Sequence, residues 1–274
     1  MFSNNTDAYK FILGNARRSK KENRIAIKKK VNKLRVNTPE VMLKITSFTK
    51  TKKQVVDHLS YIARNGNVPI FDSYDRDVSE ERAAGDIARD IVEIKGRKTM
   101  DMVLSMPPGT PENTFVDATQ EYLKKYFGNH DYFYSFHNDT DCYHAHVVVP
   151  MVDRNLNRIN PRKADIEKWR EGFAEELEIK GIPANAMKSL AKGKYKNNIP
   201  NSKFRTKGTN EDKRAVSEPL KRKVISAWRY IYKDMTDNNE RETAESINQF
   251  MKDEFKTSFM VRGQDKIEDN ELTR

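Results

Sequence analysis

Three of the five histidines in this chain lie within ten residues, in the segment HNDTDCYHAH. His144 and His146 are two residues apart, so on a β-strand their side chains project from the same face. If residues 131–137 and 144–150 form a hairpin, symmetric pairing places His137 opposite His144, with Cβ atoms about 5 Å apart. Three neutral imidazoles at that spacing can bind one divalent cation and leave positions open, as catalytic sites do. The sequence therefore predicts a metal site on these three histidines.

A metal site is not the only interpretation of this pattern. A polar hairpin can carry alternating histidines that bind nothing. A cupin-type metal site also begins with His-x-His, but it needs a glutamate a few residues later, and residues 147–150 are Val-Val-Val-Pro. Three imidazoles expected on one face favour the metal site over both alternatives.

The hydrophobic pattern predicts a sheet that would hold this hairpin. Runs of β-branched and apolar residues predict strands at 41–48, 99–106, 131–137 and 144–150, with a short extended piece at 68–71. Apolar residues at helical spacing predict helices at 52–64, 80–94, 111–127 and 162–181. Thr49 or Thr51 can cap the first helix, and Thr110 can cap the third. The order of elements predicts an α+β fold with a central, mainly antiparallel sheet and flanking helices.

Three regions of the chain differ in composition. Residues 1–40 are predicted to form a basic helical arm with little apolar surface to bury. Residues 41–185 contain the predicted strands and form the predicted catalytic domain. Residues 186–274 begin as a basic linker and end in two helices, expected at about 215–234 and 240–254.

Positive charge is concentrated near the two ends of the chain. Lysine and arginine number 51 against 40 acidic residues, which gives a net charge of +11. Residues 17–35 alone contain ten basic residues and one glutamate. Such segregation indicates a polyanionic partner, with nucleic acid first, although a solvated helix face can carry a similar run.

The composition also bears on the compartment. No apolar run reaches the roughly 18 residues of a membrane span, so no membrane insertion is expected. The first fifteen residues lack the pattern of a secretion signal. The single cysteine, Cys142, excludes an internal disulfide framework and a cysteine-based zinc finger. A cytosolic location is expected.

The histidine segment resembles a motif of a known enzyme family. HNDTDCYHAHVVV is similar to motif III, His-x-Asp-x₄-His-x-His, of the conjugative relaxases of the P mobilisation class, which are His-hydrophobe-His nucleases of the MobA/VirD type. Ala145 is a weak hydrophobe at the middle position. Two further matches occur in the family's order: QVVDHLSYIARNG resembles motif I, and LSMPPGT resembles motif II. The resemblance covers about residues 41–181.

The resemblance implies a role for each matched residue, with the three histidines as the metal ligands. Tyr61 in motif I would be the nucleophile, and Arg64 in the basic ending of that motif would contact DNA. Asp139 would complete the catalytic set by orienting a ligand histidine, or would only close the hairpin turn. Ser105 and Thr110 of motif II would contact the DNA backbone, although Thr110 equally suits a helix cap.

Tyrosine suits a reversible cleavage, because a phosphotyrosyl ester keeps the energy of the phosphodiester. A phenol ionises only at about pH 10, so metal charge on the phosphate and a nearby base must assist. His58 lies three residues before Tyr61, on roughly the same face of the predicted helix. It is either a partner of that site or an exposed polar residue. Because some relaxases of another class use histidine, it is also a lesser rival as nucleophile.

The resemblance implies a conjugative relaxase, a site- and strand-specific nickase at the plasmid transfer origin that forms a 5′-phosphotyrosyl intermediate and later religates the strand. The implied cofactor is a divalent metal ion, Mg²⁺ or Mn²⁺ by family habit, with Zn²⁺ or Ni²⁺ open because imidazoles favour such ions. The implied partners are single-stranded or hairpin DNA of the transfer origin, relaxosome accessory proteins, and a type IV coupling protein and secretion system. The implied location is the bacterial cytoplasm, with export to the recipient cell on the DNA.

Two other functions stay open at this point. A rolling-circle replication initiator or transposase of the same nuclease family usually places its tyrosine after the histidine pair, whereas Tyr61 comes first here. A non-catalytic basic DNA-binding accessory protein would explain the charge, but not three converging histidines with a tyrosine at the motif position.

Overall fold

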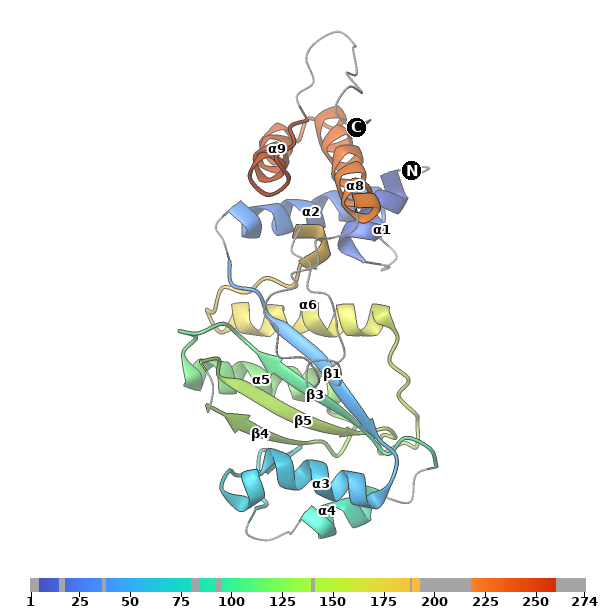
Figure 1. Ribbon diagram of the computed structural model, residues 1–274, viewed down its shortest axis with the longest axis vertical. Coiled ribbons are helices and arrows are strands. Elements are labelled where there is room, and N and C mark those ends of the chain that lie inside the picture. The colour runs from blue at the N-terminus through green and yellow to red at the C-terminus, as the bar shows by residue number, and fades with distance from the viewer. Residues whose placement is uncertain are drawn as a thin grey trace. The chain divides into compact units, whose positions relative to one another are not determined.

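The structure is a computed structural model that describes residues 5–14, 18–35, 38–79, 84–91, 95–138, 141–187, 189–192 and 218–259. The chain forms two compact units (Figure 1). Unit 1 consists of Met1–Val36 and Met187–Arg274, and unit 2 is Asn37–Ala186. Within the described ranges, no helix combines the length and apolar character that crossing a membrane requires.

Unit 2 is built on a five-stranded sheet with the order β1-β3-β5-β4-β2. Every neighbouring pair of strands is antiparallel. The strands are β1 (Met42–Thr49), β2 (Phe71–Asp72), β3 (Thr99–Ser105), β4 (Phe133–His137) and β5 (His144–Pro150). The predicted α+β fold with an antiparallel sheet is therefore confirmed.

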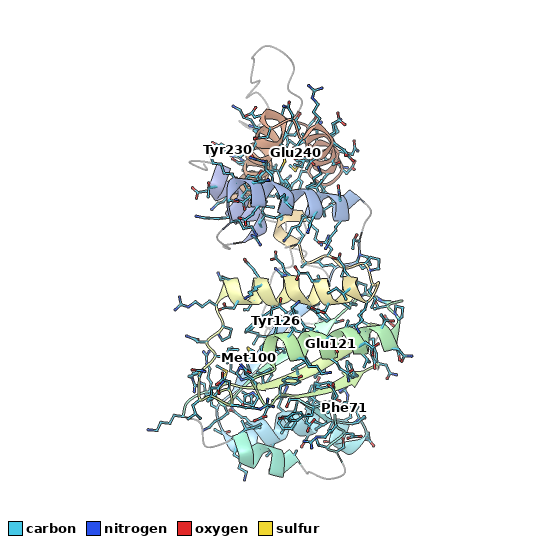
Figure 2. The ribbon with its side chains drawn as sticks, turned by 180° about the vertical axis from the view of Figure 1, so that it is seen from behind. Phe71, Met100, Glu121, Tyr126, Tyr230 and Glu240 are labelled. Carbon is cyan, nitrogen blue, oxygen red and sulfur yellow. The ribbon has the colours of Figure 1, made fainter. Side chains whose placement is uncertain are left out.

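Helices α5 (Glu112–Phe127) and α6 (Lys163–Ile179) cover one face of this sheet (Figure 1). Alternate strand residues on this face point into a core that they share with the two helices. This core includes Met100, Met102, Leu104 and Val147 of the strands and Phe115, Tyr122 and Phe173 of the helices. Tyr126 of α5, labelled in Figure 2, approaches α6 at Gly172, where a Cβ atom would collide with its ring and hydroxyl. The missing Cβ of Gly172 therefore leaves room for the Tyr126 ring between the two helices.

Helices α3 (Lys52–Ile62) and α4 (Ala84–Ile91) lie on the opposite face of the sheet (Figure 1). The buried residues of α3, which are Val55, Leu59 and Ile62, form a cluster with Phe133 and Val148 of the sheet. The predicted helix at 80–94 corresponds to α4, although its residues 80–83 and 92–94 lie outside the described ranges. The polar strand residues on this same face form the candidate active site.

The helix caps agree only in part with the prediction. Thr51 caps α3 in a capping box, in which its hydroxyl accepts the Gln54 N–H and the Gln54 side chain accepts the Thr51 N–H. Thr110 does not cap α5, because the N-cap position is Pro111. The Thr110 hydroxyl instead donates to the Pro107 carbonyl at 2.8 Å and closes the preceding turn.

Unit 1 is helical. Its elements are α1 (Asn5–Leu13), α2 (Lys20–Arg35), η2 (Ser189–Lys192), α8 (Glu218–Asp237) and α9 (Arg241–Phe255). Helix α1 packs on α8, and α2 packs on α9. The expectation that the N-terminal arm has little to bury is wrong, because Ile12, Ile27 and Val31 are buried in one cluster with Trp228 and Ile231. The two ends of the chain, predicted as separate regions, thus supply the helices of a single unit.

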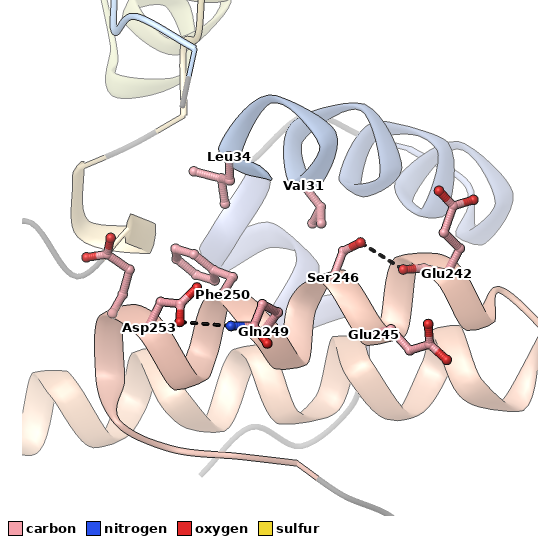
Figure 3. A pocket seen from close by; sticks show the side chains of 9 residues that line it. Val31, Leu34, Glu242, Glu245, Ser246, Gln249, Phe250 and Asp253 are labelled. Carbon is pink, nitrogen blue, oxygen red and sulfur yellow. Dashed lines mark hydrogen bonds between the residues drawn. The ribbon is translucent and has the colours of Figure 1, made fainter. Parts of the chain in front are cut away.

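A groove of about 450 Å³ is lined by residues of α2 and α9 (Figure 3). Val31, Leu34 and Phe250 form its apolar part, and Glu242 and Glu245 are among its acidic residues. Among the described residues that line this groove there is no histidine or tyrosine. Tyr61 and the three clustered histidines all belong to unit 2.

Candidate active site

The three histidines of the hairpin converge. His137 of β4 pairs with His144 of β5, so the predicted register is confirmed. One nitrogen of each ring, including that of His146, lies within 4.8 Å of the other two. The ring centroids are 4.5 Å apart for His137 and His146, 5.1 Å for His144 and His146, and 5.3 Å for His137 and His144. This spacing allows one cation to contact all three rings.

Backbone carbonyls fix the orientation of two of these rings. The Nε2–H of His137 donates to the Ile62 carbonyl at 2.7 Å, and the Nδ1–H of His144 donates to the Cys142 carbonyl at 2.9 Å. A carbonyl can only accept, so each ring carries its proton on that nitrogen. The opposite nitrogen is then the unprotonated one, the form that binds a cation. The donor set fits a divalent metal ion.

His146 is held neutral by its surroundings. Burial is the largest cause that lowers the pKa of His146, and together with the positive charges of His137, His144, His58 and Arg64 it brings this pKa to about 3. Only 8% of this residue is exposed. A histidine must be neutral to ligate a metal, so this environment favours the ligand form.

Tyr61 lies beside the histidines. Its ring meets that of His146 edge-on, with the ring centroids 5.6 Å apart. The residue is 52% exposed, because Val55, Leu59 and Ile62 form the buried face of α3 and leave Tyr61 outside it. The structure therefore brings together an accessible phenol and the candidate metal ligands.

A left-handed turn after α3 positions Arg64. Arg64, Asn65 and Gly66 have φ angles of 49°, 56° and 91°, and the first two residues are not glycine. A non-glycine residue in this left-handed conformation costs about 1–3 kcal/mol of conformational free energy, and such residues tend to occur at functional sites. The Asn67 side chain donates to the Arg64 carbonyl at 2.8 Å and supports the turn. The Arg64 guanidinium lies 5.4 Å from the centroid of the Tyr61 ring.

His58 connects this tyrosine to a buried carboxylate. Its ring stacks on that of Tyr61, with centroids 6.0 Å apart and planes 26° apart. Its Nε2 lies 3.8 Å from Oδ1 of Asp101, a residue with 0% exposure. His58, for which the sequence favoured an exposed polar residue over a partner of the site, is thus half-buried beside the tyrosine.

Asp101 is a residue of this site that was not predicted from the sequence. Thr99 donates to its Oδ1 at 2.8 Å, and Ser47 donates to its Oδ2. A β-bulge in β1 between Ile45 and Ser47 brings Ser47 opposite Asp101. The available signal was an acid in the middle of the apolar run TMDMVLSM, because a buried strand carries a carboxylate only when partners stabilise it.

The remaining predicted residues are placed as follows. Ser105 pairs with His144 on the same face of the sheet, is 5% exposed, and donates to the Met106 carbonyl at 3.3 Å. Thr110 is half-buried in the turn that follows β3. Asp139 lies outside the described residues. DNA contacts by Ser105, Thr110 and Arg64 stay predictions, as does the role of Asp139.

Comparison with known proteins identifies the family. Residues 14–181 match the nuclease domain of the MobA/VirD2-like relaxases. This match covers more than half of the chain, so the chain belongs to that family and the family prediction is confirmed. The match does not specify the P mobilisation class, which stays a prediction.

Two individual proteins are similar to this chain. The T-DNA border endonuclease VirD2 of Rhizobium rhizogenes is 24% identical over 183 residues, which are 57% of this chain and 42% of VirD2. The chain thus aligns with less than half the length of that relative. A solved structure on the molecular basis of vancomycin resistance transfer in Staphylococcus aureus covers 54% of this chain and 98% of its own, with 14% identity and a TM-score of 0.37.

Proposed function

We propose that this chain is a conjugative relaxase that nicks one DNA strand at a transfer origin and holds its 5′ end on Tyr61. The observation that carries this proposal is the accessible Tyr61 ring 5.6 Å from His146, within a set of three converging histidines. A tyrosine in this place has a nucleophilic oxygen next to a site suited to a phosphate-binding cation.

The proposed step balances without a further reactant. The Tyr61 oxygen forms a bond to phosphorus as the bond from phosphorus to the 3′ oxygen breaks. The phenol gives up its proton, and the leaving oxygen takes one up. The products are a 5′-phosphotyrosyl ester and a free 3′-hydroxyl, and attack by that hydroxyl restores the strand.

His137, His144 and His146 would hold the divalent ion. The family resemblance favours Mg²⁺ or Mn²⁺, whereas three imidazole ligands favour Zn²⁺ or Ni²⁺. A bound cation supplies positive charge that draws electron density from the scissile phosphate. The carbonyl partners of His137 and His144 keep those rings in the binding tautomer, which lowers the cost of ordering them.

Two other groups would assist Tyr61. His58, stacked on the phenol, would accept its proton, and Asp101 would orient that imidazole and stabilise its charged form. The Arg64 guanidinium would add positive charge next to the phosphate. Asp101 is a positioning residue, because its contacts run through His58, Thr99 and Ser47 rather than to the substrate.

The DNA would be single-stranded or hairpin DNA of a transfer origin. Exposed lysines of α2, among them Lys20, Lys21, Lys28 and Lys29, support binding to a phosphate backbone. The chain would act in the bacterial cytoplasm with relaxosome accessory proteins. A type IV coupling protein and secretion system would then export it on the DNA to the recipient cell.

The experiment is nicking of a supercoiled plasmid that carries a candidate transfer origin, in the presence of Mg²⁺ or Mn²⁺. We expect an open-circular product with one break at a fixed position, and a plasmid without an origin is the control. Binding of the origin without any nick would instead support the accessory-protein alternative. Repeated rounds of strand synthesis from the nick, once a DNA polymerase and nucleotides are added, would support a replication initiator.

A further inference from the structure

A pocket of about 420 Å³ borders the candidate active site in unit 2. It lies where β4 extends past β2, because β2 pairs only with Phe133 and Tyr134 and leaves the later residues of β4 without that neighbour. Two of its lining residues also belong to the candidate site: His137, a candidate metal ligand, and Arg64, which lies over the Tyr61 ring. A molecule in this pocket would therefore be next to the reacting groups.

Aromatic side chains form much of the pocket wall. Phe71, Phe136 and Tyr143 line it, and each is only partly buried. The Phe136 and Tyr143 rings are 5.8 Å apart with planes 5° apart, and the fully buried Phe115 packs against both at 6.2 Å and 5.5 Å. These rings present fixed flat faces, and nucleic-acid bases stack well on such faces.

Amide side chains form another part of the wall. Asn67, Gln120 and Asn138 line the pocket and offer both donors and acceptors, as the edge of a base requires. Gln120 is oriented before any ligand binds: its Nε2 donates to the Tyr134 hydroxyl at 3.0 Å, and that hydroxyl donates to Asp75 at 2.7 Å. An amide held in this way can discriminate between base edges.

We infer that this pocket binds one unpaired base of the DNA strand, from a nucleotide next to the scissile phosphate, and thereby sets the sequence preference at that position. The inference rests on the proposed function, because the position of the phosphate is taken from Tyr61 and the three histidines. The base stacks on the aromatic wall, and its edge contacts the amides. The ligand class is a nucleobase rather than a phosphate, because Arg64 is the one lysine or arginine among the described residues that line the pocket.

The test uses the full chain and a random-sequence library of single-stranded oligonucleotides with Mn²⁺. Oligonucleotides bound by Tyr61→Phe are recovered and sequenced, and so are those that wild type captures covalently. Val116→Trp, on α5 in the pocket wall, fills the pocket. Asp117→Trp adds the same ring at the next, exposed position of that helix and is the matched control. Gln120→Leu is a milder second variant that removes only the amide.

We expect Val116→Trp to reduce the base preference at one position by about tenfold, with the other positions unchanged. Gln120→Leu should alter the preferred base at that same position, and Asp117→Trp should alter none. A single abasic site at that position should weaken binding of wild type but not of Val116→Trp. The inference would be overturned if wild type, Val116→Trp and Gln120→Leu had the same base preference at that position. It would also be overturned if the abasic site weakened DNA binding of all three proteins equally.

Failure of the pocket and failure of the proposed function are distinguishable. The selection with Tyr61→Phe and the abasic scan need binding alone, so they report on the pocket even if no adduct forms. If an adduct forms and its sequence preference is the same in Val116→Trp as in wild type, the pocket does not bind the base, and the proposed nuclease function still holds. If neither DNA binding nor an adduct is observed, both the pocket inference and the proposed function are wrong. A protein segment would then be the better candidate for the ligand of the aromatic wall.

Discussion

The His146 imidazole lies edge-on to the Tyr61 phenol ring, with 5.6 Å between the ring centroids. One residue comes from strand β5 and the other from helix α3, and the contact exists because α3 packs on the sheet through Val55, Leu59 and Ile62. The same packing brings the Ile62 carbonyl to His137. The position of α3 thus determines both the place of the nucleophile and the orientation of a metal ligand.

Loss of one histidine should remove metal binding. We expect His146→Ala to lower Mn²⁺ affinity by at least about tenfold, because it deletes one of three ligands. Even the loss of a group that only orients a ligand lowers metal affinity by about 10–100-fold. Calorimetric titration with Mn²⁺ measures this. His130→Gln is the control, since His130 bonds to the Pro150 carbonyl and is not in the cluster. Equal Mn²⁺ affinity of His146→Ala and wild type would contradict the site, as would full cleavage in excess chelator.

His58 and Asp101 should act on the rate rather than on binding. We expect His58→Ala to slow adduct formation by about 10²-fold and to flatten its pH dependence, because proton transfer is lost. Asp101→Asn keeps the shape of the side chain and should show a smaller loss with an altered pH profile. Single-turnover rates over a pH series measure this, with thermal melts as the control for folding. An unchanged rate and pH profile in both variants would exclude the proposed proton path.

The metal-free protein should show an abnormal histidine titration. Since burial and, to a smaller extent, neighbouring positive charges lower the pKa of His146 to about 3, its ring should stay neutral at pH 5. The unfolded chain takes up a proton on this residue below about pH 6.5, and the folded chain does not, so the free energy of unfolding should fall as the pH drops from 6.5 toward 3. Histidine NMR signals and denaturant unfolding at two pH values measure this. A His146 signal that titrates near pH 6.5 would disprove the burial argument.

The N-terminal helices should contribute to the stability of unit 1. We expect Ile27→Ala to lower the free energy of unfolding by about 2–5 kcal/mol, because Ile27 is fully buried among unit 1 residues. Ile25→Ala on the same helix is the control, since Ile25 is 48% exposed and its loss should cost less than about 0.5 kcal/mol. Urea unfolding followed by Trp228 fluorescence in a Trp169→Phe background measures both. Equal effects of the two variants would show that α2 does not pack as described.

The sequence predicted the site well where local patterns determine it. The register of the hairpin follows from strand alternation around a short polar turn, so His137 and His144 could be paired from spacing alone. The helix that carries Tyr61 follows from helical periodicity, but spacing alone left Tyr61 open as a core residue, and only the structure shows that it is exposed. Its distance from His146 needed the family resemblance, because no local rule fixes how α3 lies on the sheet.

The sequence could not predict features that depend on distant contacts. Asp101 is tied to His58 and Ser47, which lie more than forty residues away along the chain, and a β-bulge sets one of those contacts. The burial of Ile27 depends on α8 and α9 from the other end of the chain. The aromatic pocket joins two motif residues, Arg64 and His137, to Phe71 of β2, Gln120 of α5 and Phe136 of β4, which belong to no recognised motif.

The most direct measurement is the identity of the residue that carries the DNA. The full chain is incubated with an origin oligonucleotide and Mn²⁺, denatured, digested, and analysed by mass spectrometry for the nucleotide-bearing peptide. We expect a 5′-phosphate linked to Tyr61, and no adduct from Tyr61→Phe although DNA binding persists, because only a hydroxyl is lost. A full yield of adduct from Tyr61→Phe, or DNA attached to His58 or to another tyrosine, would contradict the proposed nucleophile.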